Sequence, residues 1–147
     1  MAAEGDGAAA LLIASPQRAR DLGLVPKARL VSFATAGVGP AIWPVATVPA
    51  TSEALRRAGL AQDEVDRFEV HESSSAAVLA WLVETGAPRE RVNPDGGALA
   101  ITAPLGAAGA GLFVSAVAGL VARDQRYALV GVAGEGGVAT ACVLERI

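Results

Sequence analysis

The sequence has few of the side chains that do chemistry near neutral pH. It contains one histidine and one cysteine. A single cysteine excludes an internal disulfide, and with one histidine it cannot complete a zinc site of four Cys and His ligands. We therefore expect no disulfide and no metal, and a reducing, cytoplasmic setting is the default.

Charge is also sparse and evenly spread. Twelve Lys and Arg oppose fifteen Asp and Glu, for a net charge of -3, and no basic run stands out. This pattern argues against binding to nucleic acid or to an anionic membrane surface. The N-terminal segment lacks the basic lead of a secretory signal. We expect neither nucleic-acid nor membrane partners.

Aromatic residues make up only 4% of the 147 residues, although 52% are hydrophobic. One domain with a core of Ala, Val and Leu is expected. The uncharged run 96–122 is long enough for a membrane span. Pro104 and several glycines limit its helical part to 105–122, and no basic residues flank it. We prefer a helix buried on all sides in a protein core.

Apolar runs and turn residues predict alternating strands and helices. Residues 39–50, with three prolines, are predicted to be an irregular surface excursion. The predicted elements are strands over 7–15, 28–38, 67–70, 127–133 and 138–147, and helices over 17–22, from 51 or 52 to 58, from 61, within 73–86 including its serine cap and glycine stop, and over 105–122. This order indicates an α/β fold with a mixed sheet, and its loops beyond the strand ends are the places for a site.

His71 and Glu72 follow a predicted strand directly, where such folds place an acid, a base or a water-orienting group. A hydrogen-bonded structural histidine is the alternative. Ser73 and Ser74 could be nucleophiles, but no G-x-S-x-G motif is present, so capping of the next helix is favoured. "GAAGAG" fits neither a dinucleotide fingerprint nor a P-loop. Its small residues favour close backbone packing, and "GEGG" favours a hairpin turn.

Three segments, "GDGAAALLIAS", "VNPDGGALAITAPLGAAGA" and "GVAGEGGVA", resemble in order the motifs of the C-terminal half of the thiolase superfamily, whose members make and cleave 3-ketoacyl thioesters of coenzyme A. The resemblance implies a thiolase-like C-terminal domain: a mixed five-stranded sheet with helices on both faces and one fully buried helix. Residues 1–24 would be the end of the N-terminal half, a strand plus a short helix. Residues 25–147 would be the C-terminal domain.

The sequence departs from the family pattern at the catalytic positions. Ala103 stands where thiolases have the histidine of Gly-His-Pro, and Gly131 stands where they have their second catalytic cysteine. His71 replaces the asparagine of Asn-Glu-Ala-Phe, Glu72 is kept, and Ser74 replaces the pocket-lining phenylalanine. The nucleophilic cysteine belongs to the N-terminal half. Cys142 lies in the last predicted strand and is not a counterpart of either cysteine.

The resemblance therefore implies a subunit of acyl-CoA metabolism that is inactive alone. It would complete a coenzyme A thioester pocket with a thiolase-like N-terminal-half chain or a full-length thiolase-like chain, and no covalently bound cofactor is implied. His71 would be its acid/base and Glu72 the orienting group. A non-catalytic homo-oligomeric module and a truncated fragment are the alternatives. The expected pocket positions are Ser73, Ser74, Ala103, Gly131 and Gly134.

Overall fold

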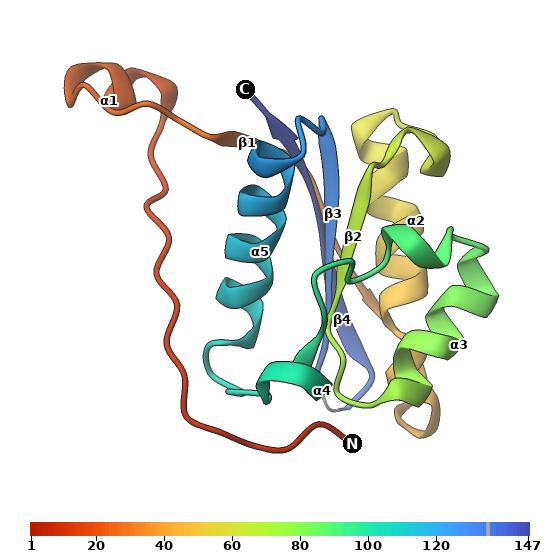
Figure 1. Ribbon diagram of the computed structural model, residues 1–147. Coiled ribbons are helices and arrows are strands. Elements are labelled where there is room, and N and C mark those ends of the chain that lie inside the picture. Colours follow the sequence, from red (N-terminus) through yellow and green to blue (C-terminus); the bar gives the residue numbers. More distant parts are fainter. Residues whose placement is uncertain (135) are drawn as a thin grey trace.

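A computed structural model describes residues 1–134 and 136–147 and contains a four-stranded mixed sheet (Figure 1). The strand order is β1-β4-β3-β2, with antiparallel pairing of β4 to both β1 and β3 and parallel pairing of β2 to β3. The strands are β1 (Ala28–Gly37), β2 (Arg67–Val70), β3 (Tyr127–Gly134) and β4 (Val138–Arg146).

Helices cover both faces of this sheet, as the alternating pattern predicted. α2 and α3 pack on one face and α5 packs on the other (Figure 1). The helices are α1 (Pro16–Asp21), α2 (Thr47–Ala58), α3 (Ser75–Thr85), α4 (Ala98–Ile101) and α5 (Ala108–Ala122), with 3₁₀ turns at Pro40–Val45, Gln62–Glu64 and Arg89–Arg91. The α/β class is confirmed.

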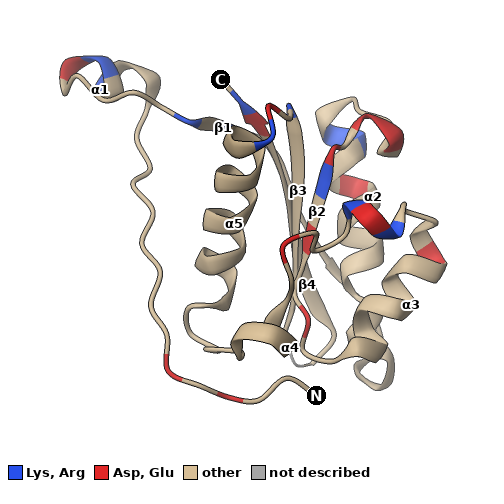
Figure 2. Cartoon of the chain, in the orientation of Figure 1, with Lys and Arg blue, Asp and Glu red and all other residues tan. Residues whose placement is uncertain are grey.

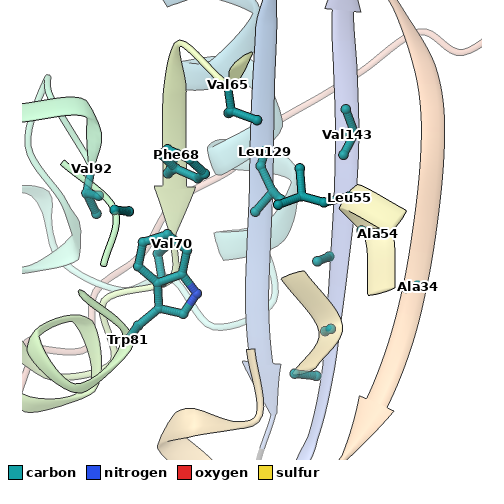
Figure 3. Close-up of a cluster of buried hydrophobic side chains, with 14 of the residues drawn as sticks. Ala34, Ala54, Leu55, Val65, Phe68, Val70, Trp81, Val92, Leu129 and Val143 are labelled. Carbon is teal, nitrogen blue, oxygen red and sulfur yellow. The ribbon is translucent and has the colours of Figure 1, made fainter. Parts of the chain in front are cut away.

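The larger core lies between the sheet and the pair α2 and α3 (Figure 3). Phe68 of β2 and Trp81 of α3 are its fully buried aromatic residues, with ring centroids 5.4 Å apart. Ala50 and Ala54 of α2 are completely buried, which lets this helix lie close to β1 and β4. Small side chains thus let the helix and the sheet approach closely, and the core is filled with few aromatic residues.

The predicted fifth strand over 7–15 is not formed. Residues 5–14 are extended but lie outside the sheet, and the side chains of Leu12 and Ile13 are 79% and 88% exposed. An apolar strand needs a neighbour for its backbone groups and a face on which to bury its side chains, and in the described chain this segment pairs with no strand and leaves these side chains exposed. Beyond β2 the sheet continues only as an isolated parallel bridge between Phe68 and Val92.

The fully buried helix is also wrong for this chain. α5 buries Ala116, Gly119 and Leu120 against the sheet, whereas Val114 and Val121 are 42% and 48% exposed. The reason is that the sheet covers one side of the helix and the described chain has no second layer above it. At 15 residues, α5 is the longest described helix, and no helix in the described residues is long and apolar enough to cross a membrane.

The prediction of an irregular surface excursion over 39–50 is wrong, because Pro40–Val45 form a 3₁₀ turn, Ala50 is fully buried and α2 starts earlier than predicted. The helix begins at Thr47, so that Pro49 lies in its first turn and Thr51 is buried inside it. A proline in the first turn costs no helical hydrogen bond, because backbone N–H groups there have no partner within the helix. The predicted end is confirmed, with Gly59 in the left-handed conformation at φ 68°.

Candidate functional site

The candidate site lies where β2 ends, and its first residue is His71. The His71 backbone N–H donates to the carbonyl oxygen of Gly131 on β3 at 2.8 Å. The parallel pairing of β2 with β3 therefore brings together two positions that the sequence keeps sixty residues apart. Both ring nitrogens of His71 are buried, and neither has a hydrogen-bond partner among the described residues.

Glu72 does not orient His71 through a hydrogen bond in the described chain. Its carboxylate is held by the glycine loop, where the Leu99 backbone N–H donates to Oε2 at 3.0 Å. Gly97 lies so close to the same carboxylate that a Cβ there would overlap Oε2. An alanine at 97 would therefore have to push the Glu72 carboxylate out of this position. The orienting role of Glu72 stays a prediction.

Asn93 connects this loop to the end of β2. Its side chain bonds both backbone groups of Val70: Oδ1 accepts from N–H at 2.8 Å and Nδ2 donates to the carbonyl oxygen at 3.0 Å. Its own N–H donates to the Phe68 carbonyl oxygen at 2.8 Å. The residue is 8% exposed and has φ 45°, a value that asparagine tolerates better than most residues. Sequence reasoning missed this role, although an asparagine opening a glycine-rich loop was the available signal.

Ala103, at the position of the family's histidine, is buried beneath the N-terminal segment. Its N–H donates to the Ala3 carbonyl oxygen at 2.8 Å. Gly5 lies directly over Thr102, since a Cβ on Gly5 would be 2.6 Å from Thr102 Oγ1. Thr102 has φ 71° and ψ 167°, a region that is almost restricted to glycine. By the resemblance, the thiolase motif Gly-His-Pro has glycine at this position. The backbone keeps a conformation that suits glycine, so the threonine found here is strained.

The remaining predicted positions have structural contacts. Ser74 caps α3, its Oγ accepting from the Ala77 N–H at 3.2 Å, so the capping interpretation holds. The Ser73 carbonyl oxygen accepts from the Ala2 N–H at 3.1 Å. Gly134 ends β3 next to the hairpin turn, away from the backbone contact of His71 with Gly131. A pocket role for these residues stays a prediction.

A buried ion network lies behind the site, and sequence reasoning missed it. Arg67 and Glu69 of β2 are 0% and 1% exposed and face α5, where Arg67 lies against Gly119. The Arg67 guanidinium donates to Glu69 Oε1 and to Asp95 Oδ2, and Arg123 at the end of α5 also bonds Asp95. Two charges at alternate positions in a short apolar strand were the available signal.

The network has clear electrostatic consequences. Burial lowers the pKa of Arg67, but hydrogen bonds to Asp95 and Glu69 outweigh this effect and raise it. Burial raises the pKa of Glu69 despite the opposing bond from Arg67. Hydrogen bonds from Arg123 and then Arg67 lower the pKa of Asp95. Among the residues described, no group of three His, Cys, Asp or Glu side chains is arranged to hold a metal ion.

With this geometry in view, the family comparison is decisive. The family described as "Thiolase, C-terminal domain" matches residues 24–146. This chain belongs to the thiolase family. The division of the chain into the end of a preceding half over 1–24 and a C-terminal domain over 25–147 stays a prediction.

Curated thiolases match nearly the whole chain. The 3-oxoadipyl-CoA/3-oxo-5,6-dehydrosuberyl-CoA thiolase of Escherichia coli is 46% identical over 97% of this chain, and the acetyl-CoA acetyltransferase of the same species is 41% identical over 97%. The steroid 3-ketoacyl-CoA thiolase FadA6 of Mycobacterium tuberculosis is 39% identical over 97%. The chain spans only about a third of each relative, 36%, 36% and 35% respectively.

A solved structure agrees. The crystal structure of the Bacillus anthracis acetyl-CoA acetyltransferase aligns with a TM-score of 0.88 and 30% identity, covering 90% of this chain and 34% of that one. The thiolase fold is thus shown, and this chain corresponds to one half of it.

Proposed function

We propose that the chain supplies the C-terminal half of a thiolase-type site for coenzyme A thioesters and works with a thiolase-like chain that supplies the N-terminal half. The observation that supports this proposal is an apolar face that the chain leaves open. α5 has no charged residue along its whole length, and Figure 2 shows the absence of charge beside the charged α1 and sheet ends.

The open face extends from α5 onto the sheet. Phe33 of β1 pairs with Cys142 of β4, and Cys142 pairs with Val130 of β3, which packs under α5. Directly opposed residues share a face, so Phe33 lies on the α5 side, where it is 57% exposed. Leu30 is equally exposed, and its opposed residue, Leu144, also packs under α5.

α5 thus covers β2 and β3 and leaves β1 bare. Leu11 of the N-terminal segment lines an open hollow together with Val114 and Val117 of α5, at the edge of the same face. Contiguous apolar surface of this kind marks an interaction site. A neighbouring helix and sheet of the N-terminal half, as the family resemblance implies, would cover it.

The site supports pocket formation more than independent catalysis. Thioester exchange requires a nucleophile, a group that holds its proton, and donors for the oxyanion. Ala103 and Gly131 carry no functional group at two of the family's catalytic positions. The His71 imidazole, with its unpartnered ring nitrogens, is the acid/base that we assign to this half. Its partners would then come from the thioester or from the other chain.

A matched pair of surface variants tests the docking. Phe33→Glu places a carboxylate on the open face, and Leu79→Glu places one on the outer side of α3, where Leu79 is also 57% exposed. With a tagged chain in its native host, a thiolase N-terminal-half polypeptide should co-purify with the unaltered chain and with Leu79→Glu but not with Phe33→Glu. Equal retention by both variants would place the partner elsewhere.

The second candidate function is a non-catalytic homo-oligomeric module. It is favoured by Ala103 and Gly131, which have no functional group at two of the family's catalytic positions. It predicts a stable symmetric assembly of this chain alone, with no second polypeptide. In the complex with a partner, His71→Ala separates the roles: survival of full acyl-transfer activity would remove the acid/base role and leave pocket formation.

A further inference from the structure

The loop at 93–97 connects the buried ion network to the candidate site. Asp95 lies in its middle and is 41% exposed, and its Oδ2 accepts from Nη2 of the completely buried Arg67 at 2.7 Å. Arg67 itself is fixed, because its Nε and Nη2 also donate to Glu69 at 3.0 and 2.6 Å and α5 passes directly over its guanidinium at Gly119. The carboxylate of Asp95 is therefore held by a rigid group.

The other side of the same loop holds Glu72. Gly97 touches its carboxylate, and the Leu99 N–H, two residues later, donates to it at 3.0 Å. At the start of the loop, Asn93 bonds both backbone groups of Val70, the residue before His71. The positions of the Glu72 carboxylate and of the backbone entering His71 thus both depend on where this loop lies.

We propose that Asp95 is a positioning residue for the site: by tying the loop to Arg67, it fixes the Glu72 carboxylate and the neighbouring His71 ring. Its importance for activity rests on the proposed function, but the geometric part does not. Asp95 touches neither His71 nor Glu72 in the described chain, so it acts through the loop.

Arg123 bonds both oxygens of Asp95, but it is the more exposed of the two anchors. Its ion pair with Asp95 joins side chains that are 45% and 41% exposed, and such pairs are screened by solvent. The pair of Asp95 with Arg67 has one wholly desolvated partner. Charge-assisted hydrogen bonds to a fixed, buried guanidinium restrict geometry more than those to a mobile surface arginine. We therefore assign the positioning effect to Arg67.

Three variants of the full chain, in the assembly in which it purifies, test the proposal. Asp95→Asn removes the charge at nearly constant size. Asp124→Asn is the matched control, since Asp124 is 92% exposed and pairs only with Arg146 among the described residues. Arg123→Gln removes the surface anchor alone. Two readouts apply: hydrogen exchange of the Leu99 amide, with the Val143 amide of β4 as reference, and the ring NMR signals of His71, the sole histidine.

In Asp95→Asn we expect Leu99 exchange to accelerate by about tenfold or more, with Val143 exchange unchanged within about twofold, because only the loop loosens. The His71 ring signals should shift. Asp124→Asn should leave both readouts unchanged, and Arg123→Gln should change Leu99 exchange by less than about threefold. If a partner complex is active, Asp95→Asn should lower kcat more than it raises KM.

Three results would overturn the proposal. Unchanged Leu99 exchange and His71 signals in Asp95→Asn would show that the loop needs no anchor. Equal acceleration at Leu99 and Val143 would show general destabilisation instead of positioning. If Arg123→Gln accelerated Leu99 exchange as much as Asp95→Asn does, the ion pair of Asp95 with Arg123, and not the one with Arg67, would hold the loop. Hydrogen exchange and NMR do not depend on catalytic activity. The role of Asp95 can therefore be judged even if the chain proves to have no part in thioester chemistry.

Discussion

Replacing Gly119 with alanine tests how closely α5 lies on the buried arginine of β2. A Cβ at this position would overlap Nη1 of Arg67. An isolated arginine could turn its end aside at little cost, but this one is 0% exposed and donates to both Glu69 and Asp95. Making room therefore requires either breaking these bonds or lifting the helix from the sheet.

The sizes of the opposing energy terms decide whether Gly119→Ala stabilises or destabilises the protein. Glycine to alanine in a helix interior gains about 1 kcal/mol of helix propensity. Losing even one charge-assisted hydrogen bond of a buried group costs about 1.5–3 kcal/mol, and overpacking adds about 1–3 kcal/mol. We expect Gly119→Ala to lower the free energy of unfolding by about 1.5 kcal/mol or more, after the propensity gain is subtracted.

The same helix supplies a control. A Cβ on Gly111 would meet nothing within 4 Å, so Gly111→Ala should raise the free energy of unfolding by about 0.5–1 kcal/mol. Urea unfolding followed by circular dichroism, with both variants compared at one protein concentration, measures the difference. If Gly119→Ala proves as stabilising as Gly111→Ala, Arg67 does not lie beneath α5 as described.

The other predictions concern strain, pH and activity. Thr102→Gly should raise the urea midpoint, because relief of the strained φ of 71° gains about 1–3 kcal/mol and the added chain entropy of glycine offsets about 0.5–1 kcal/mol; a lower midpoint would contradict the strained conformation. Hydrogen bonds from Arg56 and Arg57 lower the pKa of Glu53 from 4.5 to about 2, so its stabilisation is present above pH 4.5 and is lost as the pH falls toward 2. Glu53→Gln should therefore flatten the fall of the midpoint across that window, and an unchanged slope would show that Glu53 contributes nothing. The purified chain alone should not thiolyse acetoacetyl-CoA, as judged by thiolysis against a no-protein control; turnover clearly above that control would refute the partner requirement.

Local signals predicted the elements whose ends are set locally. Ser74 caps α3, and Gly86 ends it in the left-handed conformation with φ 66°, as the serine and glycine signals indicated. The β3–β4 hairpin followed from two apolar runs around a glycine turn. Each of these features depends on residues only a few positions apart, so the sequence carries them directly.

Features that depend on distant chain segments were missed or wrong. The apolar run at 7–15 has the composition of a strand, but forming one requires pairing with a distant strand, and in the described chain the segment lies outside the sheet. The contact of His71 with Gly131 requires parallel pairing of β2 with β3, which no local pattern specifies. The arrangement of Arg67, Asp95 and Arg123 joins three elements, and only the fold brings them together.

Binding of acetoacetyl-CoA shows whether the chain forms a coenzyme A pocket only together with a partner. Calorimetric titration would compare the chain alone with its complex with a thiolase-like N-terminal-half chain. We expect saturable binding to the complex and none to the chain alone, because the open face beside α5 and the unpartnered His71 ring need the other half to form the pocket. Equal binding by the chain alone, or no binding by the complex, would contradict it.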